Sequence, residues 1–138
     1  MALRPNLTLA QFHAKQAGTL PEQYGFRLTD MSEGSLAAAF EIKRWMHAPN
    51  GFLHAASVIC LADTLCGYAS VAHLPESAKG FTTIELKSNF LGTAKEGVIS
   101  CIATAEHLGR NTHVWSATVL SPQGKKMALF RCTQMILY

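Results

Sequence analysis

The sequence predicts an α+β fold in which a curved antiparallel sheet of five to six strands wraps around one long central helix. The longest apolar stretch, residues 52–72, is apolar on all sides, so a helix formed there must be enclosed. Two segments rich in β-formers precede it and four follow it, separated by turn signals. With 138 residues and no repeat or linker, the chain is expected to form a single domain, residues 1–138.

The elements before the long helix are short. Thr8 and Gln11 fit a capping box that opens a short helix, which is expected to stop at Gly18. The next expected elements are a turn at 21–25, strands at 26–31 and 35–43 joined by a turn at 32–34, and a loop at 45–51. The two strands are therefore predicted to form a hairpin.

The long helix is expected from about Leu53 to Ala72, with a connector at 75–80 after it. Four β-rich segments make up the rest of the chain, at 81–91, 97–107, 112–120 and 127–137. The last two are separated by Ser121-Pro-Gln-Gly124, which has the Pro and Gly positions of a β-turn.

Composition bounds the function and the setting of the protein. Apolar residues make up 49% of the chain and charged residues 15%, which favours burial of some apolar surface against another subunit. The net charge is +3 and no Lys or Arg run exceeds Lys125-Lys126, so a nucleic-acid surface is not predicted. The four cysteines have no metal or redox spacing, and the first residues lack a signal-peptide core. We expect a cytoplasmic protein with reduced thiols.

Asp63 is the one carboxylate inside the long apolar stretch. At the centre of a membrane-spanning helix it would cost about 3 kcal/mol, so we expect a helix enclosed in protein and no membrane partner. An acid in such surroundings either keeps its proton or finds a partner, and acids of this kind are often used in catalysis. The alternative is a structural acid bonded to a nearby Thr or backbone amide.

The start of the helix, residues 50–56, is the second candidate feature. Amide groups in a first helical turn lack internal partners and can bind an anion or polarise a carbonyl. The alternative is an ordinary helix start in which Asn50 or His54 satisfies the cap. Ala55 and Asp63 are eight residues apart, about 12 Å along a helix axis, so one carbonyl cannot touch both. A site that uses both requires two chains in a symmetric dimer.

Other chemistries have little support in the sequence. There is no G-x-S-x-G motif, and Ser57 with His54 has no acid placed to complete a triad. The six histidines form no metal motif, and neither a P-loop nor a dinucleotide fingerprint is present. We therefore expect no metal and no cofactor.

Several motifs together resemble one known family. They are Gly51-x-x-His54-Ala-Ala, Leu61-Ala-Asp63-Thr, Phe81–Leu91, Gly109-Arg110-x-Thr112 and Gly124-Lys-x-x-Ala128. In this order and spacing they resemble the hotdog-fold acyl-CoA thioesterases, closest to the phenylacetate-pathway (PaaI-like) type that is related to 4-hydroxybenzoyl-CoA thioesterases. The resemblance covers residue 20 to the end and implies dimers, often paired into tetramers, with active sites between subunits.

The resemblance also implies roles for individual residues. Asp63 would act as general base or nucleophile, the amide of Ala55 after the motif His54 would polarise the thioester carbonyl, and Thr83 would position water. Asn50 is a candidate partner of water or of the carbonyl. The implied contacts with CoA, which is part of the substrate, are Leu91, Gly92, Lys95, His107, Gly109, Arg110, Asn111 and Thr112, with Lys95 and Arg110 as phosphate contacts.

The chain departs from the family at three points. The family usually has His-Gly-Gly where this chain has His54-Ala55-Ala56, and its Asn or Gln ahead of the His stands at a longer spacing than Asn50. Strict alternation would place Thr83 on the face of Glu85 and Lys87, and the sequence leaves open whether Thr82 or Thr83 faces the site.

These observations predict a metal-independent acyl-CoA thioesterase that hydrolyses a thioester to a free acid and CoA. The alternative is a non-catalytic acyl-CoA binding or regulatory protein on the same fold, which the Ala55-Ala56 pair favours. A hydratase or dehydratase has no paired His and acid to support it. The acyl group is not predicted, although Trp45, Phe52, Tyr68 and Phe90 can line an aryl or medium-chain pocket instead of plain core.

Overall fold

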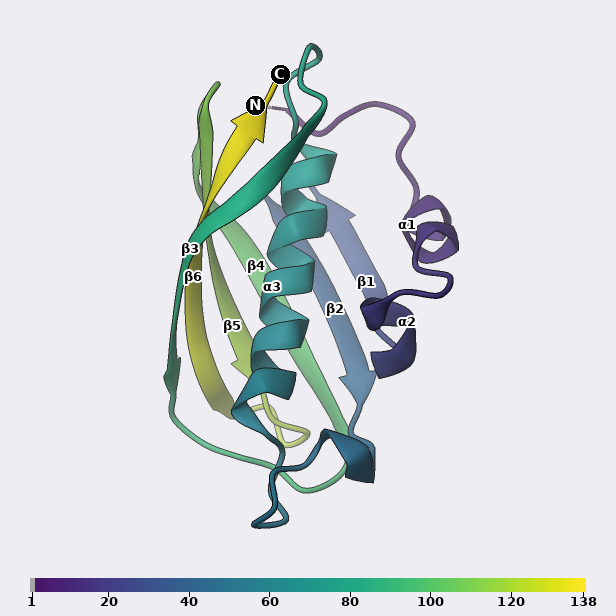
Figure 1. Cartoon of the computed structure of the whole chain (residues 1–138), viewed down its shortest axis with the longest axis vertical. Helices are drawn as coiled ribbons and strands as arrows, with labels where there is room; N and C mark the ends of the chain where they lie inside the picture. Colours follow the sequence, from purple (N-terminus) through teal and green to yellow (C-terminus); the bar gives the residue numbers. More distant parts are fainter. Residues whose placement is uncertain (1) are drawn as a thin grey trace.

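The computed structural model describes residues 2–138 and contains one long helix lying against a curved sheet (Figure 1). The helical elements are α1 (Leu9–Lys15), α2 (Leu20–Tyr24), the 3-10 helix η1 (Arg44–Met46) and α3 (Ala55–Ala72). The strands are β1 (Arg27–Ser32), β2 (Ser35–Glu41), β3 (Gly80–Phe90), β4 (Val98–Leu108), β5 (Thr112–Leu120) and β6 (Lys126–Leu137).

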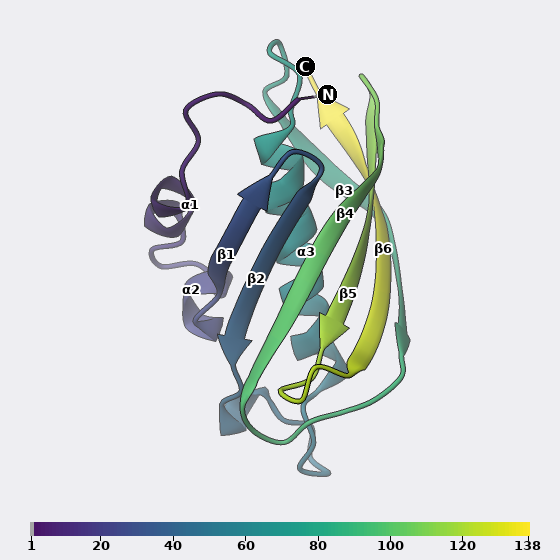
Figure 2. The same cartoon turned by 180° about the vertical axis from the view of Figure 1, so that it is seen from behind.

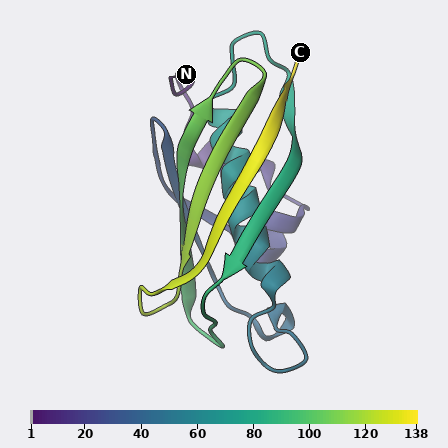
Figure 3. The ribbon, with the colours of Figure 1, turned by 90° about the vertical axis from the view of Figure 1, so that its left-hand side faces the viewer.

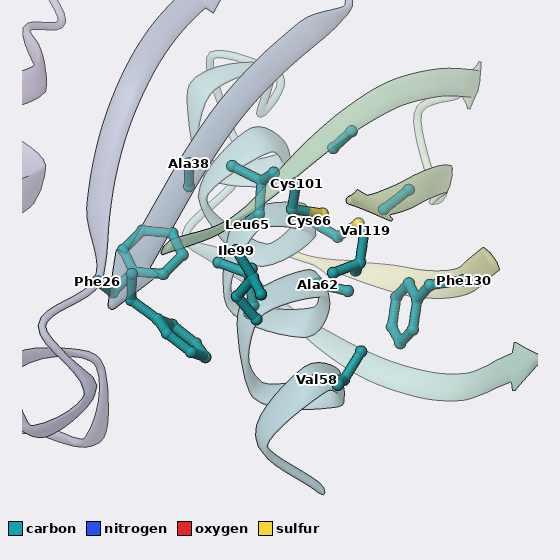
Figure 4. Packing of buried hydrophobic residues seen from close by; sticks show 14 of the residues in the cluster. Phe26, Ala38, Val58, Ala62, Leu65, Cys66, Ile99, Cys101, Val119 and Phe130 are labelled. Atoms are coloured by element: carbon teal, nitrogen blue, oxygen red, sulfur yellow. The ribbon is translucent and has the colours of Figure 1, made fainter. Parts of the chain in front are cut away.

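All six strands belong to one antiparallel sheet of order β1-β2-β4-β5-β6-β3, which confirms the predicted α+β class. Figure 3 shows the sheet curling past α3. The core lies between them, where Leu65 and Ala62 of α3 meet Ile99, Val119 and Phe130 of the strands (Figure 4). The sheet leaves β1 and β3 as its two edges.

Four boundaries differ from the sequence expectations. Helix α1 ends at Lys15 and not at Gly18. Residues 20–24 form the short helix α2 instead of a turn, because Pro21 suits the first turn of a helix and Gly25 ends it with a left-handed φ of 67°. The strand predicted to reach residue 43 ends at Glu41, and η1 follows. Helix α3 begins at Ala55 and not at Leu53, because Leu53 pairs with His47 in an isolated bridge.

Strand β3 contains a bulge that the sequence did not predict. Thr83 pairs with Gln134 of β6, but the next pair is Glu85 with Thr133, so Ile84 is an extra residue. Gln134 is fully buried against α3, and cross-strand partners share a face, so Thr83 and not Thr82 faces the helix. The expected alternation was wrong beyond this point, because the bulge returns Glu85 and Lys87 to the outer face.

By length and composition, helix α3 is long and apolar enough to cross a membrane, but 56% of this 18-residue segment is buried inside the protein. One side of the helix faces the sheet. Part of the rest is covered by the N-terminal segment, where the Phe12 ring of α1 lies 5.1 Å from the Tyr68 ring. Helix α3 is therefore the core helix of this fold.

A polar cluster centred on Ser70, which we call the Ser70 cluster, ties the end of α3 to the sheet. The Ser70 hydroxyl donates to Gln134 Oε1 and accepts from Trp115 Nε1 at 2.9 Å. His113 Nδ1 lies 3.3 Å from the same hydroxyl, whose proton is already given to Gln134, so His113 is the donor. His113 Nε2 and Gln134 Nε2 are buried and have no hydrogen-bond partner in the part of the chain that the structure describes. The cluster therefore holds a neutral histidine.

Candidate active site

Asp63 lies in the middle of α3, and one of its carboxylate oxygens is buried. Its Oδ1 is buried and has no hydrogen-bond partner among the residues that the structure describes. Burial raises the pKa of this carboxyl above its usual value. Within residues 2–138, Oδ1 therefore makes none of the bonds to a Thr or a backbone amide that the structural alternative expects. A carboxylate oxygen without a partner is available to accept a proton.

The surroundings of Asp63 are small and apolar. One turn further on, a Cβ added at Gly67 would lie 3.1 Å from the ring of Phe81 in β3, so the helix and this edge strand approach closely. One turn before, burial raises the pKa of the Cys60 thiol to about 11, a change to which the nearby Asp63 also contributes. Cys60 is therefore a neutral thiol at physiological pH, which leaves Asp63 as the acidic group of this part of the helix.

The start of α3 presents one free amide. His54 is the N-cap residue, and its Nδ1 accepts from Ala56 N–H at 2.9 Å. The Ser57 and Val58 N–H groups both donate to the His54 carbonyl, at 2.9 and 3.3 Å. Within residues 2–138 the N–H of Ala55 has no acceptor. His54 thus satisfies the cap, as the structural alternative expected, but it leaves the Ala55 amide exposed to a ligand.

The capping bond also selects the tautomer of the neutral His54 ring. Because Nδ1 accepts a hydrogen bond, the proton of the neutral ring is on Nε2. Asn50 plays a local role as well, since its Oδ1 accepts from Phe52 N–H at 3.2 Å. Its amide NH2 group remains available.

A cleft of about 410 Å³ opens at the start of α3. It contains the predicted site residues Asn50, His54, Ala55 and Gly92 and the predicted pocket aromatics Phe52 and Phe90. The remaining lining residues are Ala48, Leu53, Val58, Thr93 and Met127. Sequence reasoning missed Val58 and Met127, because apolar residues in a helix and a strand look like ordinary core. Trp45 and Tyr68 do not line this cleft.

Asp63 is not part of the wall of this cleft. It lies eight residues beyond Ala55 on the same helix, about 12 Å along the axis. One chain therefore presents the free amide and the unpartnered acid at separate places. Thr83, on the helix-facing side of β3, is on the same edge of the molecule as Phe81, which touches the helix at Gly67.

The predicted CoA contacts fall at opposite ends of the sheet (Figure 2). Leu91, Gly92 and Lys95 are in the β3–β4 connection beside the start of α3, where Lys95 Nζ lies 4.6 Å from the centre of the Phe52 ring. His107, Gly109, Arg110, Asn111 and Thr112 are at the β4–β5 hairpin at the other end. Arg110 lies 5.6 Å from the Tyr138 ring centre, and its carbonyl accepts from the Tyr138 hydroxyl at 2.6 Å. A single chain does not bring the two sets together.

No group of three His, Cys, Asp or Glu side chains within residues 2–138 is close enough to hold a metal ion. The four cysteines are all free, and Cys66, Cys101 and Cys132 are buried. Two polar groups of α3 without partners within residues 2–138 are thus the carboxylate oxygen Oδ1 of Asp63 and the N–H of Ala55.

Comparisons with known proteins agree on one family. The profile described as the thioesterase superfamily matches residues 50–128. Esterase PA1618 of Pseudomonas aeruginosa is 30% identical over 129 residues, which cover 94% of this chain and 89% of that protein. A 1,4-dihydroxy-2-naphthoyl-CoA hydrolase of Listeria monocytogenes is 25% identical over 114 residues, which cover 83% of this chain and 92% of the relative.

Solved structures agree with the sequence matches. The crystal structure of a variant of thioesterase PA1618 has a TM-score of 0.93 and 29% identity, with 99% of both chains covered. The PaaI protein of the Escherichia coli phenylacetic acid degradation operon has a TM-score of 0.82 and 21% identity, with 95% of this chain and 97% of that chain covered. The second likeness concerns the fold.

Proposed function

This chain belongs to the thioesterase superfamily and is a thioester hydrolase, and we propose that its substrate is an acyl-CoA, which it splits into a free acid and CoA. We assign the proton transfer to Asp63 and the stabilisation of the oxyanion to the N–H of Ala55. The observation that supports this assignment is the pairing of a buried, unpartnered carboxylate oxygen with an unpartnered helix-start amide. Groups without partners in the free enzyme are available to substrate.

The proposed reaction is general-base hydrolysis. A water molecule attacks the thioester carbon while Asp63 takes one of its protons, and the carbonyl π electrons move to oxygen. The resulting oxyanion accepts a hydrogen bond from Ala55 N–H, which the positive end of the helix dipole strengthens. When the carbonyl re-forms, the C–S bond breaks and the departing CoA thiolate takes the proton from Asp63.

The proposal needs two chains, because Ala55 and Asp63 of one chain are too far apart for one carbonyl. Strand β3 supports such a dimer, since it is an edge of eleven residues whose outer side has no partner strand within residues 2–138. Its Ile84 and Leu86 side chains are 52% and 40% exposed, which suits burial against a second copy. Two β3 edges joined in antiparallel fashion would bring the helix start of one chain beside Asp63 of the other.

The same arrangement explains the separation of the predicted CoA contacts. An antiparallel pairing of edges places the Lys95 end of one chain beside the Arg110 end of its partner. Lys95 of one chain and Arg110 of the other can then contact the same CoA molecule. Within one chain the two side chains lie at opposite ends of the sheet, with 14 residues between them in the sequence. Pairing of such dimers into tetramers remains part of the proposal from the family resemblance.

We propose an aromatic acyl group. Phe52, Phe90, Val58 and Met127 give the cleft an apolar wall next to the Ala55 amide, and a flat ring fits between aromatic faces. The Listeria relative is named for hydrolysis of an aromatic acyl-CoA. The deciding experiment measures thiol release from aryl, short-chain and long-chain acyl-CoAs. Fastest turnover of an aryl-CoA supports this class, and tight binding without turnover of any ester would support the non-catalytic alternative.

A further inference from the structure

A second hollow adjoins the cleft at the start of α3 and has a different chemical character. It measures about 330 Å³ and is lined by Arg44, His47, Ala48, Pro49 and Gly51, and we call it the Arg44 pocket. Ala48 lines both this pocket and the cleft, so the two hollows share a wall. A ligand lying in the cleft can extend across Ala48 into the Arg44 pocket.

The pocket has one guanidinium, that of Arg44, and no carboxylate in its wall. Within residues 2–138 the ion pairs join Lys43 to Glu41 and Arg131 to Glu106, so the exposed Arg44 has no acidic partner. His47 is oriented by a 2.7 Å hydrogen bond from Nε2 to the Lys95 carbonyl, so its Nδ1 can donate to a phosphate oxygen in the imidazolium form of the ring, which carries a proton on both nitrogens. The pocket therefore offers a guanidinium and an oriented imidazole without any anion in place.

The charge of this end of the molecule favours the same kind of ligand. The strand register brings Glu41, Val98, Lys126 and Phe90 to one end of the sheet, where α3 begins. The cations of this end are Lys43, Arg44, Lys95, Lys125 and Lys126, whereas the acids there are Glu41 and Glu96. Exposed charges of one sign raise the local concentration of an oppositely charged ligand.

We propose that Arg44 and His47 form a binding site for the phosphate groups of CoA. This inference rests on the proposed function, because it assumes a CoA thioester in the neighbouring cleft. CoA carries a pyrophosphate and a further phosphate, and a guanidinium binds phosphate oxygens in pairs through its parallel N–H groups. The pantetheine arm crosses Ala48, and the thioester lies at Ala55. Arg110, at the other end of the same chain, is not a member of this site.

The test compares the same acyl group carried by CoA and by pantetheine. Pantetheine lacks the nucleotide and all of the phosphates, and it ends in a hydroxyl group. The variant Arg44→Gln removes the charge from an exposed side chain and is expected to leave folding unchanged, which thermal unfolding checks. We expect a rise of about tenfold in KM for the CoA thioester, equivalent to one lost charged contact, and no change for the pantetheine thioester. His47→Gln should shift KM in the same direction.

Two controls have matched chemistry. Lys15→Gln removes an exposed charge on α1 and should leave both KM values unchanged, and Lys79→Gln, which removes a charge from the connection before β3, should do the same. If Arg44→Gln has the KM of the parent for the CoA thioester, or raises both KM values equally, the Arg44 site is wrong although the proposed function stands. If the parent protein releases thiol from neither ester and calorimetry detects no CoA binding, the proposed function fails and the inference fails with it.

Discussion

Thr83 of β3 and Gln134 of β6 are direct antiparallel partners, and the buried Gln134 places Thr83 on the side of the sheet that faces α3. Gln134 is itself held by the Ser70 hydroxyl of that helix. The edge strand on which the proposed dimer depends is thus connected to the core helix through one buried amide. The bulge at Ile84, one residue later, keeps Thr83 on the inner face while Glu85 turns outward.

Replacing Asp63 with Asn should abolish turnover and retain the fold. The amide cannot take a proton from water, and loss of a general base typically costs about 10² to 10⁴ in rate. The measurement is kcat from thiol release on the best acyl-CoA. Asp30→Asn is the matched control, because Asp30 is the only other aspartate of the chain and is exposed in β1. Activity of Asp63→Asn near that of the parent would remove Asp63 from the mechanism.

The same substitution should change the pH dependence of stability. Burial raises the pKa of Asp63 in the folded state, so the folded protein holds this proton more tightly than the unfolded chain does. Ionisation therefore costs stability as pH rises above the ordinary aspartate pKa of about 4. We expect Asp63→Asn to be more stable than the parent at pH 7, with the difference disappearing below pH 4. Urea unfolding at several pH values measures it, and equal curves at all pH values would contradict the expectation.

Ala55→Pro should remove the oxyanion donor with little effect on the helix. Ala55 is the first residue of α3, a position where proline is well tolerated, and its N–H has no partner to lose. We expect kcat to fall by about 10² to 10³, as for other single oxyanion donors. Ala55→Ser keeps the N–H while enlarging the side chain, and it should retain most of the activity. Equal losses in the two variants would point to steric effects in the cleft.

Mixing two inactive variants should restore activity if the site is shared between chains. In a heterodimer of Asp63→Asn and Ala55→Pro, one site receives both substitutions and the other receives neither. Chains with different affinity tags allow the heterodimer to be isolated and its kcat compared with that of each homodimer. We expect about half the parent activity. A verified heterodimer as inactive as its parents would place Asp63 and Ala55 in one chain's site or in no common site.

The Ser70 cluster should make the protein sensitive to acid. Burial, with a contribution from His73 nearby, lowers the pKa of His113 to about 4, so the folded state excludes a proton that the unfolded chain binds. This contribution to stability is complete above the ordinary histidine pKa of about 6.5 and is lost as pH falls from there to about 4. His113→Phe should flatten the stability curve in this range, measured by urea unfolding. Equal slopes for the parent and His113→Phe in this range would contradict the expectation.

Much of the fold was predictable because each element has a local signal. The apolar stretch predicted the start and end of α3 to within two residues. The segment Ser121-Pro-Gln-Gly124 predicted the last turn, because Pro and Gly suit particular positions of a β-turn. Residues 20–24 were predicted as a turn because Pro and Gly are also turn residues, and a five-residue helix carries no periodic pattern. The bulge at Ile84 depends on pairing with β6 and has no signal within β3 itself.

The site was predictable in its parts and not in its geometry. Asp63 and the helix start stand out from their neighbours by charge and by capping chemistry. That Ala55 alone keeps a free N–H follows from where the His54 ring points, which no sequence pattern specifies. Lys95 and Arg110 were grouped by resemblance, and only the strand register shows that they belong to opposite ends of a chain.

The close contact between Gly67 and Phe81 limits how this protein can diverge. Even an alanine at position 67 would bring a methyl group to 3.1 Å from the ring, so the ring would have to shift or shrink. Substitutions at Gly67 and Phe81 should therefore be linked, because a variant that gains a methyl or hydroxyl group at position 67 needs a smaller side chain at position 81. In laboratory evolution towards new substrates, we expect a substitution of Gly67 to be accompanied by a substitution of Phe81.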